Sequence, residues 1–294
     1  MPSPPLGAPS RDASVPALVV RRDGARSEWQ RDSLVAEEPL EVRLREGGGE
    51  GVRFVVTMRT PGDDEDLATG LLYGEGIIDS AAEVLALGRP SDPRISAELA
   101  RNVIVATLAP RPDRPDRVPR RATVMGSACG VCGRTSIEDV VKLAGASRTR
   151  SAATPGAADV TISTAVLTSL PGKLRERQSI FASTGGLHAA GLFEVDGTLV
   201  AAREDVGRHN ATDKVVGALL RAGRPAPPVL LVSGRLGFEI AQKAALAGVR
   251  VVAAVSAPTS LAVDLAEETG LTLVGFLRGE RFNVYTHPER IGES

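Results

Sequence analysis

Apolar and polar residues in the first half of the chain follow the spacing of short strands and one helix. They alternate one by one over residues 40–45, which is the period of a half-buried strand. Residues 52–58 and 102–108 are apolar enough to form two further strands. Between them, the acidic run 63–66 precedes an apolar-periodic stretch, and acidic side chains favour the N-terminal end of a helix. The pattern predicts an α+β region.

The second half has a more regular pattern. Residues 192–195 and 198–201 flank Asp196-Gly197, a pair that fits the tight turn of a β-hairpin. Helical spacing covers residues 165–179 and 210–220, and Asn210 is the expected cap of the second helix. Strands and helices then alternate: 229–232, 238–247, 249–255, 261–268 and 271–276. This alternation predicts parallel strands with crossover helices, and therefore an α/β layered domain.

Two segments with unusual composition set the expected boundaries. Residues 1–16 hold five prolines and little apolar mass, so we expect a disordered tail. Residues 111–121 are rich in proline and arginine, which places a domain boundary near their end. The predicted organisation is a tail over 1–16, an N-terminal α+β region over 17–126, and a cysteine loop with the α/β domain over 127–294.

Composition and charge narrow the classes of function. The chain has 294 residues, 43% apolar and 24% charged, as in an ordinary globular protein. A net charge of -1 gives no reason to expect nucleic acid or a membrane as partner. No apolar run reaches the roughly 18 residues of a membrane helix, and the start lacks a hydrophobic signal region. We therefore expect a cytoplasmic protein, in which two cysteines are reduced and reactive.

The two cysteines, Cys129 and Cys132, lie in the small-residue segment 127–133. A helix predicted to start near residue 136 would place a thiol by a helix N-terminus, where the thiolate is stabilised. The residues alone leave four interpretations open: sulfur transfer, redox chemistry, metal binding and a structural turn. A zinc site needs about four ligands, and His188 and His209 lie outside finger spacing. A thioredoxin-like pair normally lies near the start of a βαβ pattern.

Polar loops follow several strands of the second half. His188 comes after a glycine pair, His209 lies in the densely charged stretch 203–214, and Ser233-Gly234-Arg235 follows a strand and opens a helix. Residues 256–259 repeat that arrangement after the next strand. Open α/β sheets bind ligands at such strand ends, where backbone amides and an arginine can hold phosphate. These loops predict an anionic ligand of nucleotide size.

Taken together, the motifs resemble the FdhD family of formate dehydrogenase accessory sulfurtransferases over roughly residues 40–290. The matching segments are 65–70 with 75–76, 127–133, 184–190, 204–214, 233–235 and 256–259. The resemblance implies a sulfur carrier that takes sulfur from a cysteine desulfurase as a cysteine persulfide. The carrier passes this sulfur to the molybdenum or tungsten bis-guanine-dinucleotide cofactor before that cofactor enters formate dehydrogenase.

The resemblance also implies a fold, an assembly and site residues. The fold is a cytidine-deaminase-like layered domain, a mixed sheet with flanking helices, and the assembly is a homodimer. Cys129 would carry the persulfide and Cys132 would assist, with no resident metal. The cofactor-binding stretch of the family falls on Phe276, Leu277, Arg278, Gly279, Glu280 and Arg281. Arg235, Arg278 and Arg281 could bind the anionic cofactor, and His188 or His209 could move a proton.

Other functions are weighed against this one. Zinc deaminases need an H-x-E motif, but His188 is followed by Ala189-Ala190, so we do not expect deamination. Two alternatives to the sulfur carrier stay open. One is a cofactor-binding chaperone without sulfur chemistry, and the other is a zinc-binding structural protein.

Overall fold

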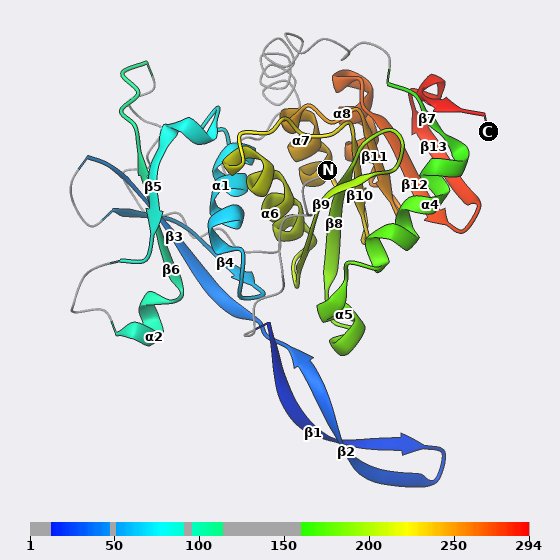
Figure 1. Ribbon diagram of the computed structural model, residues 1–294, viewed down its shortest axis with the longest axis horizontal. Coiled ribbons are helices and arrows are strands. Elements are labelled where there is room, and N and C mark those ends of the chain that lie inside the picture. Colours follow the sequence, from blue (N-terminus) through cyan, green and yellow to red (C-terminus); the bar gives the residue numbers. More distant parts are fainter. Residues whose placement is uncertain (1–12, 48–50, 91–95, 114–159, 294) are drawn as a thin grey trace.

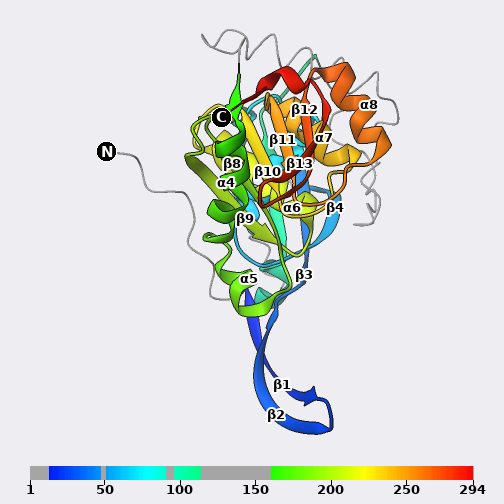
Figure 2. The same cartoon turned by 90° about the vertical axis from the view of Figure 1, so that its right-hand side faces the viewer.

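Two β-sheets, joined by a pair of helices packed between them, make up most of the described structure (Figure 1). The computed structural model describes residues 13–47, 51–90, 96–113 and 160–293. A two-stranded arm projects away from these sheets, as the turned view also shows (Figure 2). None of the helices in these described ranges is both long and apolar enough to cross a membrane.

The larger sheet has six strands in the order β13-β12-β11-β10-β8-β9. Its central strands β10, β11 and β12 are parallel, while β8, β9 and β13 run antiparallel to their neighbours. The strands are β8 (His188–Phe193), β9 (Leu199–Asp205), β10 (Val229–Val232), β11 (Val251–Ala254), β12 (Thr272–Arg278) and β13 (Arg281–Thr286). The predicted α/β domain is therefore confirmed, with a mixed sheet.

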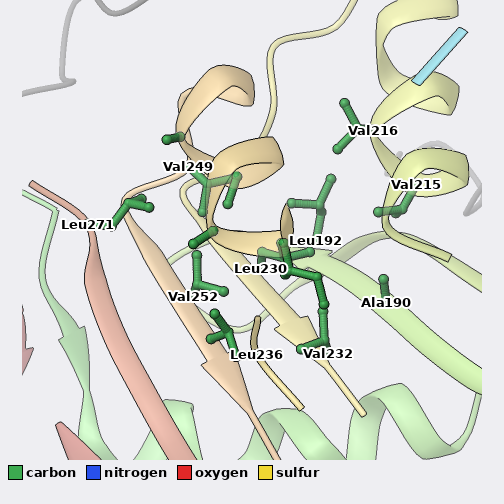
Figure 3. Packing of buried hydrophobic residues seen from close by; sticks show 14 of the residues in the cluster. Ala190, Leu192, Val215, Val216, Leu230, Val232, Leu236, Val249, Val252 and Leu271 are labelled. Atoms are coloured by element: carbon green, nitrogen blue, oxygen red, sulfur yellow. The ribbon is translucent and has the colours of Figure 1, made fainter. Parts of the chain in front are cut away.

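Helices cover both faces of this sheet, because successive residues of each strand point to opposite sides. On one face Leu230 and Val252 pack with α6 (Arg208–Arg221), α7 (Phe238–Ala247) and α8 (Ser260–Thr269), as Figure 3 shows for part of this cluster. On the other face Leu231 and Ala253 pack with α4 (Thr164–Arg175). The short helix α5 (Ser179–Thr184) and a pairing of β7 (Ile162–Ser163) with β14 (Ile291–Gly292) complete the region.

The smaller sheet belongs to the N-terminal region and has the order β4-β3-β6-β5. Its strands are β3 (Glu38–Glu46), β4 (Val52–Arg59), β5 (Val84–Gly88) and β6 (Val103–Leu108), with short helices η1 (Ala81–Glu83) and α2 (Ala97–Ala100). Helix α1 (Asp64–Gly74) packs Leu67 and Leu72 against this sheet. The predicted strands and the helix after the acidic run are confirmed.

Some local predictions are wrong. The helix predicted over 165–179 ends at Arg175, and α5 forms separately. The hairpin around Asp196-Gly197 is confirmed, since β8 pairs antiparallel with β9, but its turn is longer than two residues, and the Glu194 amide donates to the Thr198 carbonyl across it. Asn210 does not cap its helix, because α6 already begins at Arg208 after Gly207. Its amide instead donates to the Met58 carbonyl at 2.7 Å.

The chain before β3 forms the arm, from β1 (Ser14–Asp23) and β2 (Arg26–Val35). The structure places Ser14 in β1, where it pairs with Val35, although the sequence assigned residue 14 to a tail. That prediction rested on the prolines at 2, 4, 5, 9 and 16. From Ser14 onward, however, the chain forms a strand because it pairs with residues 26–35.

Helices α1 and α6 join the two sheets through direct backbone contact at two glycines. A Cβ atom added to Gly70 would lie 1.9 Å from the Asp213 carbonyl oxygen, and one added to Gly217 would lie 1.9 Å from the Asp66 carbonyl oxygen. Any side chain at either position would therefore force the two helices apart. The surrounding ion pairs depend on this closeness, since Asp66 lies 2.7 Å from Arg203 on β9 and 2.7 Å from Arg221 on α6.

We predict that Gly70→Ala and Gly217→Ala each lower the free energy of unfolding by at least about 2 kcal/mol, because overpacking separates α1 from α6. Gly172→Ala is the matched control, because Gly172 also lies in a helix but has no atom within 4 Å of an added Cβ. This control should gain roughly 0.5–1 kcal/mol. Urea unfolding of the three variants measures both effects, and equal stability of all three would contradict the proposed contact.

Candidate functional site

Several polar loops predicted to bind a ligand meet at one edge of the six-stranded sheet. Parallel strands β10 and β11 end there at Val232 and Ala254. Because β8 runs antiparallel to both β9 and β10, its first residue His188 pairs with Asp205, the last residue of β9, at this same edge. The structure thus brings together His188, His209 and the loops 233–235 and 256–259.

Hydrogen bonds hold these loops against one another. The Ala189 amide donates to the Ser233 hydroxyl at 2.9 Å, and the Ser233 amide donates to the Ala189 carbonyl at 2.9 Å. The Leu236 amide donates to the Ala257 carbonyl at 3.1 Å, and the Phe276 amide donates to the Ser256 carbonyl at 3.1 Å. The start of β8 and the loops after β10 and β11 therefore form one continuous surface at this edge of the sheet, which we call the rim.

Gly234 lies close against His188 and Arg208. A Cβ at this position would lie 3.1 Å from His188 Nδ1 and 3.6 Å from Arg208 Cδ. The missing side chain lets the imidazole and the arginine stem lie close against the loop that follows β10. A side chain at Gly234 would therefore press on the His188 ring, which would have to shift by a few tenths of an ångström.

Arg208 is the feature that sequence reasoning missed. Its Nε atom is buried and has no hydrogen-bond partner among the residues that the structure describes. It is also the first residue of α6, whose N-terminal amides and dipole favour an anion. An unpaired buried donor is costly, so an anionic group that reached this partly buried side chain after a small shift would be stabilised. The dense charge of residues 203–214 was the available signal, but it did not distinguish Arg208 from its paired neighbours.

His188 lies next to Arg208 and is neutral at physiological pH. Burial lowers its pKa, and the Arg208 guanidinium lowers it further, while Asp205 opposes these effects and Arg235 adds to them. A neutral imidazole can both donate and accept a hydrogen bond. His188 can therefore contact an anionic ligand without adding charge of its own.

His209 is held by a buried chain of charged side chains. Its Nδ1 lies 3.1 Å from one oxygen of Glu239, and the other oxygen of Glu239 lies 3.1 Å from Lys243 Nζ. Lys243 Nζ in turn donates to Asp213 at 2.5 Å. Burial alone lowers the pKa of Lys243, but Asp213 and Glu239 outweigh it and raise that pKa above its usual value. Glu239 thus lies between the His209 ring and the ammonium group of Lys243.

This arrangement determines the state of the His209 ring. The pKa of His209 is lowered to about 4, chiefly because the ring is buried. The Glu239 carboxylate opposes this shift, while Arg208, Lys243 and His188 contribute to it. The ring is therefore neutral at pH 7. Because a carboxylate only accepts hydrogen bonds, the 3.1 Å approach of Glu239 to Nδ1 favours the tautomer with the ring proton on Nδ1. Nε2 is then left with its lone pair, which suits it to accept a proton.

Asp205 has a structural role. It is fully buried, and one oxygen lies 2.7 Å from Lys214 Nζ and 3.1 Å from the Thr60 amide. The other oxygen accepts from the Gly207 amide at 2.8 Å and from Asn210 at 3.2 Å. With both oxygens engaged, this carboxylate fixes the turn between β9 and α6 instead of acting as a base.

The stretch 276–281, expected to bind the cofactor, lies at the β12 end of the same rim. Phe276 has a left-handed backbone with φ of 55° and an exposed ring, and Arg278 Nε donates to the Val255 carbonyl at 2.9 Å. Leu277 is fully buried in the core beside α4, so it positions the stretch without reaching its surface. Gly279, Glu280 and Arg281 are exposed in the turn and at the start of β13, and Arg235 is exposed in the loop after β10.

Cys129 and Cys132 lie outside the described residues, so their assignment as the sulfur-carrying pair stays a prediction. Among the described residues, no group of three or more histidine, cysteine or acidic side chains is arranged to hold a metal ion. A cavity of about 410 Å³ lies elsewhere, between the β4–α1 turn and the end of α6. Its arginines are already paired, for example Arg59 with Asp64 at 2.9 Å and Arg101 with Glu38 at 3.0 Å.

We predict that His209 stays neutral, with its proton on Nδ1, from pH 7 down to about pH 5. Nitrogen NMR of the labelled imidazoles can follow this, since the chain has three histidines. Glu239→Gln should lower the pKa of His209 further and weaken the preference for Nδ1, because the carboxylate favours both. Glu267→Gln, 3.7 Å from His287, is the control and should leave His209 unchanged. A His209 that titrates near pH 6.5 would contradict this structure.

Comparison with known proteins agrees with the motifs of this chain. A family model described as FdhD/NarQ matches residues 35–292. The chain is 48% identical over 263 residues to the sulfur carrier protein FdhD of Mycolicibacterium paratuberculosis, covering 89% of this chain and 92% of that protein. It is 49% identical over 272 residues to the sulfur carrier protein FdhD of Streptomyces coelicolor, covering 92% of each.

A solved structure shares the fold. The crystal structure of a protein assigned as a formate dehydrogenase accessory protein, from Desulfotalea psychrophila, superposes with a TM-score of 0.68 at 24% identity. The alignment covers 95% of this chain and 100% of that one. Together with the family match and the relatives of nearly 50% identity, these comparisons establish that the chain belongs to the FdhD/NarQ family.

Proposed function

We propose that this protein is a sulfurtransferase that serves formate dehydrogenase. It takes sulfur from a cysteine desulfurase as a persulfide on Cys129 and passes it to the molybdenum or tungsten bis-guanine-dinucleotide cofactor, its bound substrate. The relatives named sulfur carrier protein support the sulfur chemistry. Binding of the cofactor is supported above all by the buried Arg208 Nε, which has no partner among the described residues and lies beside His188 in the first turn of α6.

Several features of the rim suit it to a nucleoside diphosphate. Arg208 offers a charge-assisted hydrogen bond to a phosphate oxygen, and such bonds are about twice as strong as neutral ones. The N-terminal amides of α6 add backbone donors at the same place. The bare backbone of Gly234 leaves His188 close enough to contact the ligand as a neutral donor. Arg235, Arg278 and Arg281 extend the positive charge along the rim toward β12.

The sulfur steps balance with two cysteines and one external reductant. The Cys129 thiolate attacks the outer sulfur of the desulfurase persulfide, and the desulfurase cysteine leaves as a thiolate. The Cys132 thiolate then attacks the Cys129 sulfur, so that a Cys129–Cys132 disulfide forms and the outer sulfur leaves as hydrosulfide with the electron pair of the broken bond. This sulfide is the species that would be delivered to the cofactor, the bound substrate. A cellular thiol reductant returns the disulfide to two thiols.

The His209 unit provides a proton acceptor near the cofactor. Its neutral ring, with the Nδ1 proton directed to Glu239, leaves Nε2 as a base that can accept the proton lost by the incoming sulfur. The same proposal includes the finer statements implied by the family resemblance. These are a cytidine-deaminase-like layering of the α/β domain, a homodimer and a cytoplasmic location.

We predict that incubation with a cysteine desulfurase and cysteine adds the mass of one sulfur, seen by intact mass spectrometry. Cys129→Ala should abolish the gain, because the attacking thiolate is removed. Cys132→Ala is the matched control and should keep the added sulfur longer than the wild type, because hydrosulfide release needs the second thiol. Absence of sulfur on either cysteine would favour the chaperone instead, and stoichiometric zinc in the purified protein would favour the structural zinc protein.

We predict that GDP, a fragment of the cofactor, binds at the rim and that Arg208→Gln weakens this binding by about 10- to 100-fold, the contribution of a hydrogen bond to a charged group. Arg224→Gln is the control, since Arg224 is an exposed arginine beyond the opposite end of α6. Calorimetric titration measures both affinities. Unchanged GDP binding by the Arg208 variant would remove this residue from the site.

A further inference from the structure

Lys243 is a buried lysine on α7, and the proposed sulfur transfer leaves it without a role. Its side chain is 4% exposed, and its Nζ lies 2.5 Å from Asp213 on α6 and 3.1 Å from Glu239 on α7. Removing these charged groups from water is costly, and apolar side chains of similar volume often replace buried ion pairs without loss of stability. Stability alone therefore does not account for a lysine at this position.

One carboxylate joins Lys243 to His209. Glu239 lies one turn before Lys243 on α7, and its Oε1 is 3.1 Å from the lysine Nζ. Its Oε2 is 3.1 Å from Nδ1 of His209, the second residue of α6. The ammonium group thus holds one oxygen of the carboxylate while the ring contacts the other. The direction in which Glu239 faces Nδ1 therefore depends on the lysine at its other end.

The C-terminal end of α1 covers Lys243 and Asp213. A Cβ atom added to Gly74 would lie 3.3 Å from Lys243 Cγ and 3.6 Å from Asp213 Oδ1. The Gln242 side chain donates to the Gly74 carbonyl at 3.3 Å and ties α7 to α1 beside the pair (Figure 1). Helices α1, α6 and α7 therefore enclose the ammonium group and fix its position almost without contact with water.

The carboxylates around Lys243 keep it protonated. Burial alone lowers its pKa, but Asp213, Glu239 and Glu75 outweigh burial and raise that pKa above its ordinary value. An ammonium group has three donors, so Lys243 can bind Asp213 and Glu239 at the same time. Asp213 is the anchor that holds the ammonium group from the α6 side, and a further donor remains for Glu239.

We infer that Lys243 is a positioning residue of the rim, which holds the Glu239 carboxylate against Nδ1 of His209 and so leaves Nε2 as the ring nitrogen available to a ligand. Lys243 acts on the tautomer of the ring through Glu239. The use of Nε2 as a proton acceptor rests on the proposed sulfur transfer, whereas the link from Lys243 to the ring does not. An apolar side chain at position 243 would fill the space but release one oxygen of Glu239.

Two variants that differ only at position 243 test this role. Asp213→Asn removes the charge of the anchor and keeps Lys243 on Glu239. The double variant Asp213→Asn with Lys243→Met removes both charges, so no unpaired Asp213 carboxylate stays buried. Nitrogen NMR of the labelled imidazoles at pH 7 measures the His209 tautomer in each. We expect Asp213→Asn to keep the proton on Nδ1. The double variant should lower the ratio of the Nδ1–H to the Nε2–H form about tenfold, the effect of losing a hydrogen bond to a charged group.

The comparison separates positioning from general damage to the packing. Circular dichroism and urea unfolding check that both variants are folded. Loss of the Nδ1 preference in the double variant alone would support the inference. Equal tautomer ratios in the two variants would overturn it, whether both keep the proton on Nδ1 or both lose it, because Lys243 would then make no difference.

The unmodified protein provides a second test that needs no substitution. Couplings across hydrogen bonds should join the labelled ammonium nitrogen of Lys243 to the carboxylate carbons of both Asp213 and Glu239. A coupling to Asp213 alone would also overturn the inference. Neither measurement requires the cofactor or a desulfurase, so failure of the proposed sulfur transfer in its own tests would leave this result standing.

Discussion

The close contact of α1 and α6 is the constraint on which the rest of the molecule depends. It is possible only because Gly70 and Gly217 let one helix backbone touch the other. The contact sets the N-terminal sheet against the helix that begins the site, and Asp66 then reaches both Arg203 and Arg221. Asp205 adds a second link, because it binds Lys214 within its own region and the Thr60 amide from the N-terminal one. The turn between β9 and α6 is thus fixed from both sides.

That rigidity explains why one arginine can remain unpaired. Arg203, Lys214 and Lys243 are buried in contact with carboxylates, which compensates the cost of removing their charges from water. Arg208 lies at the end of the fixed turn, and its buried Nε has no such partner within the described residues. A flexible segment would turn this group into solvent. Here the surrounding contacts keep it in place, as expected for a group preorganised to meet an anion.

The two histidines of the rim are also held in place by their surroundings, but their rings are neutral. His188 lies between Arg208 and the bare backbone of Gly234, and His209 is oriented by Glu239. Both lose charge because burial and nearby cations disfavour the protonated form. Around α6, the rim therefore combines the positive charge of Arg208 with two neutral rings. This combination suits binding a polyanion while still allowing proton transfer.

Much of the secondary structure and the identity of the polar loops could be predicted from the sequence. The alternation of strands and helices after residue 229 can be read from the local sequence. Strands buried on both faces need continuous apolar runs, and only short turns separate these runs from the helices. His188, His209 and Ser233-Gly234-Arg235 were recognisable because glycine and polar residues interrupt those runs. The arm was not recognisable, since its two strands do not alternate between apolar and polar residues and neither has a buried face.

Only the tertiary structure decided which of the polar residues are free. The stretch 203–214 contains Arg203, Asp205, Arg208, Asp213 and Lys214, and nothing in their order says which are paired. Their partners Asp66, Thr60 and Lys243 lie far away along the chain. The same holds for Leu277, which lies in the middle of a polar stretch but faces the core because strand residues alternate in direction. The sequence determines which chemical groups the protein has, and the tertiary packing determines which of these groups can still bind a ligand.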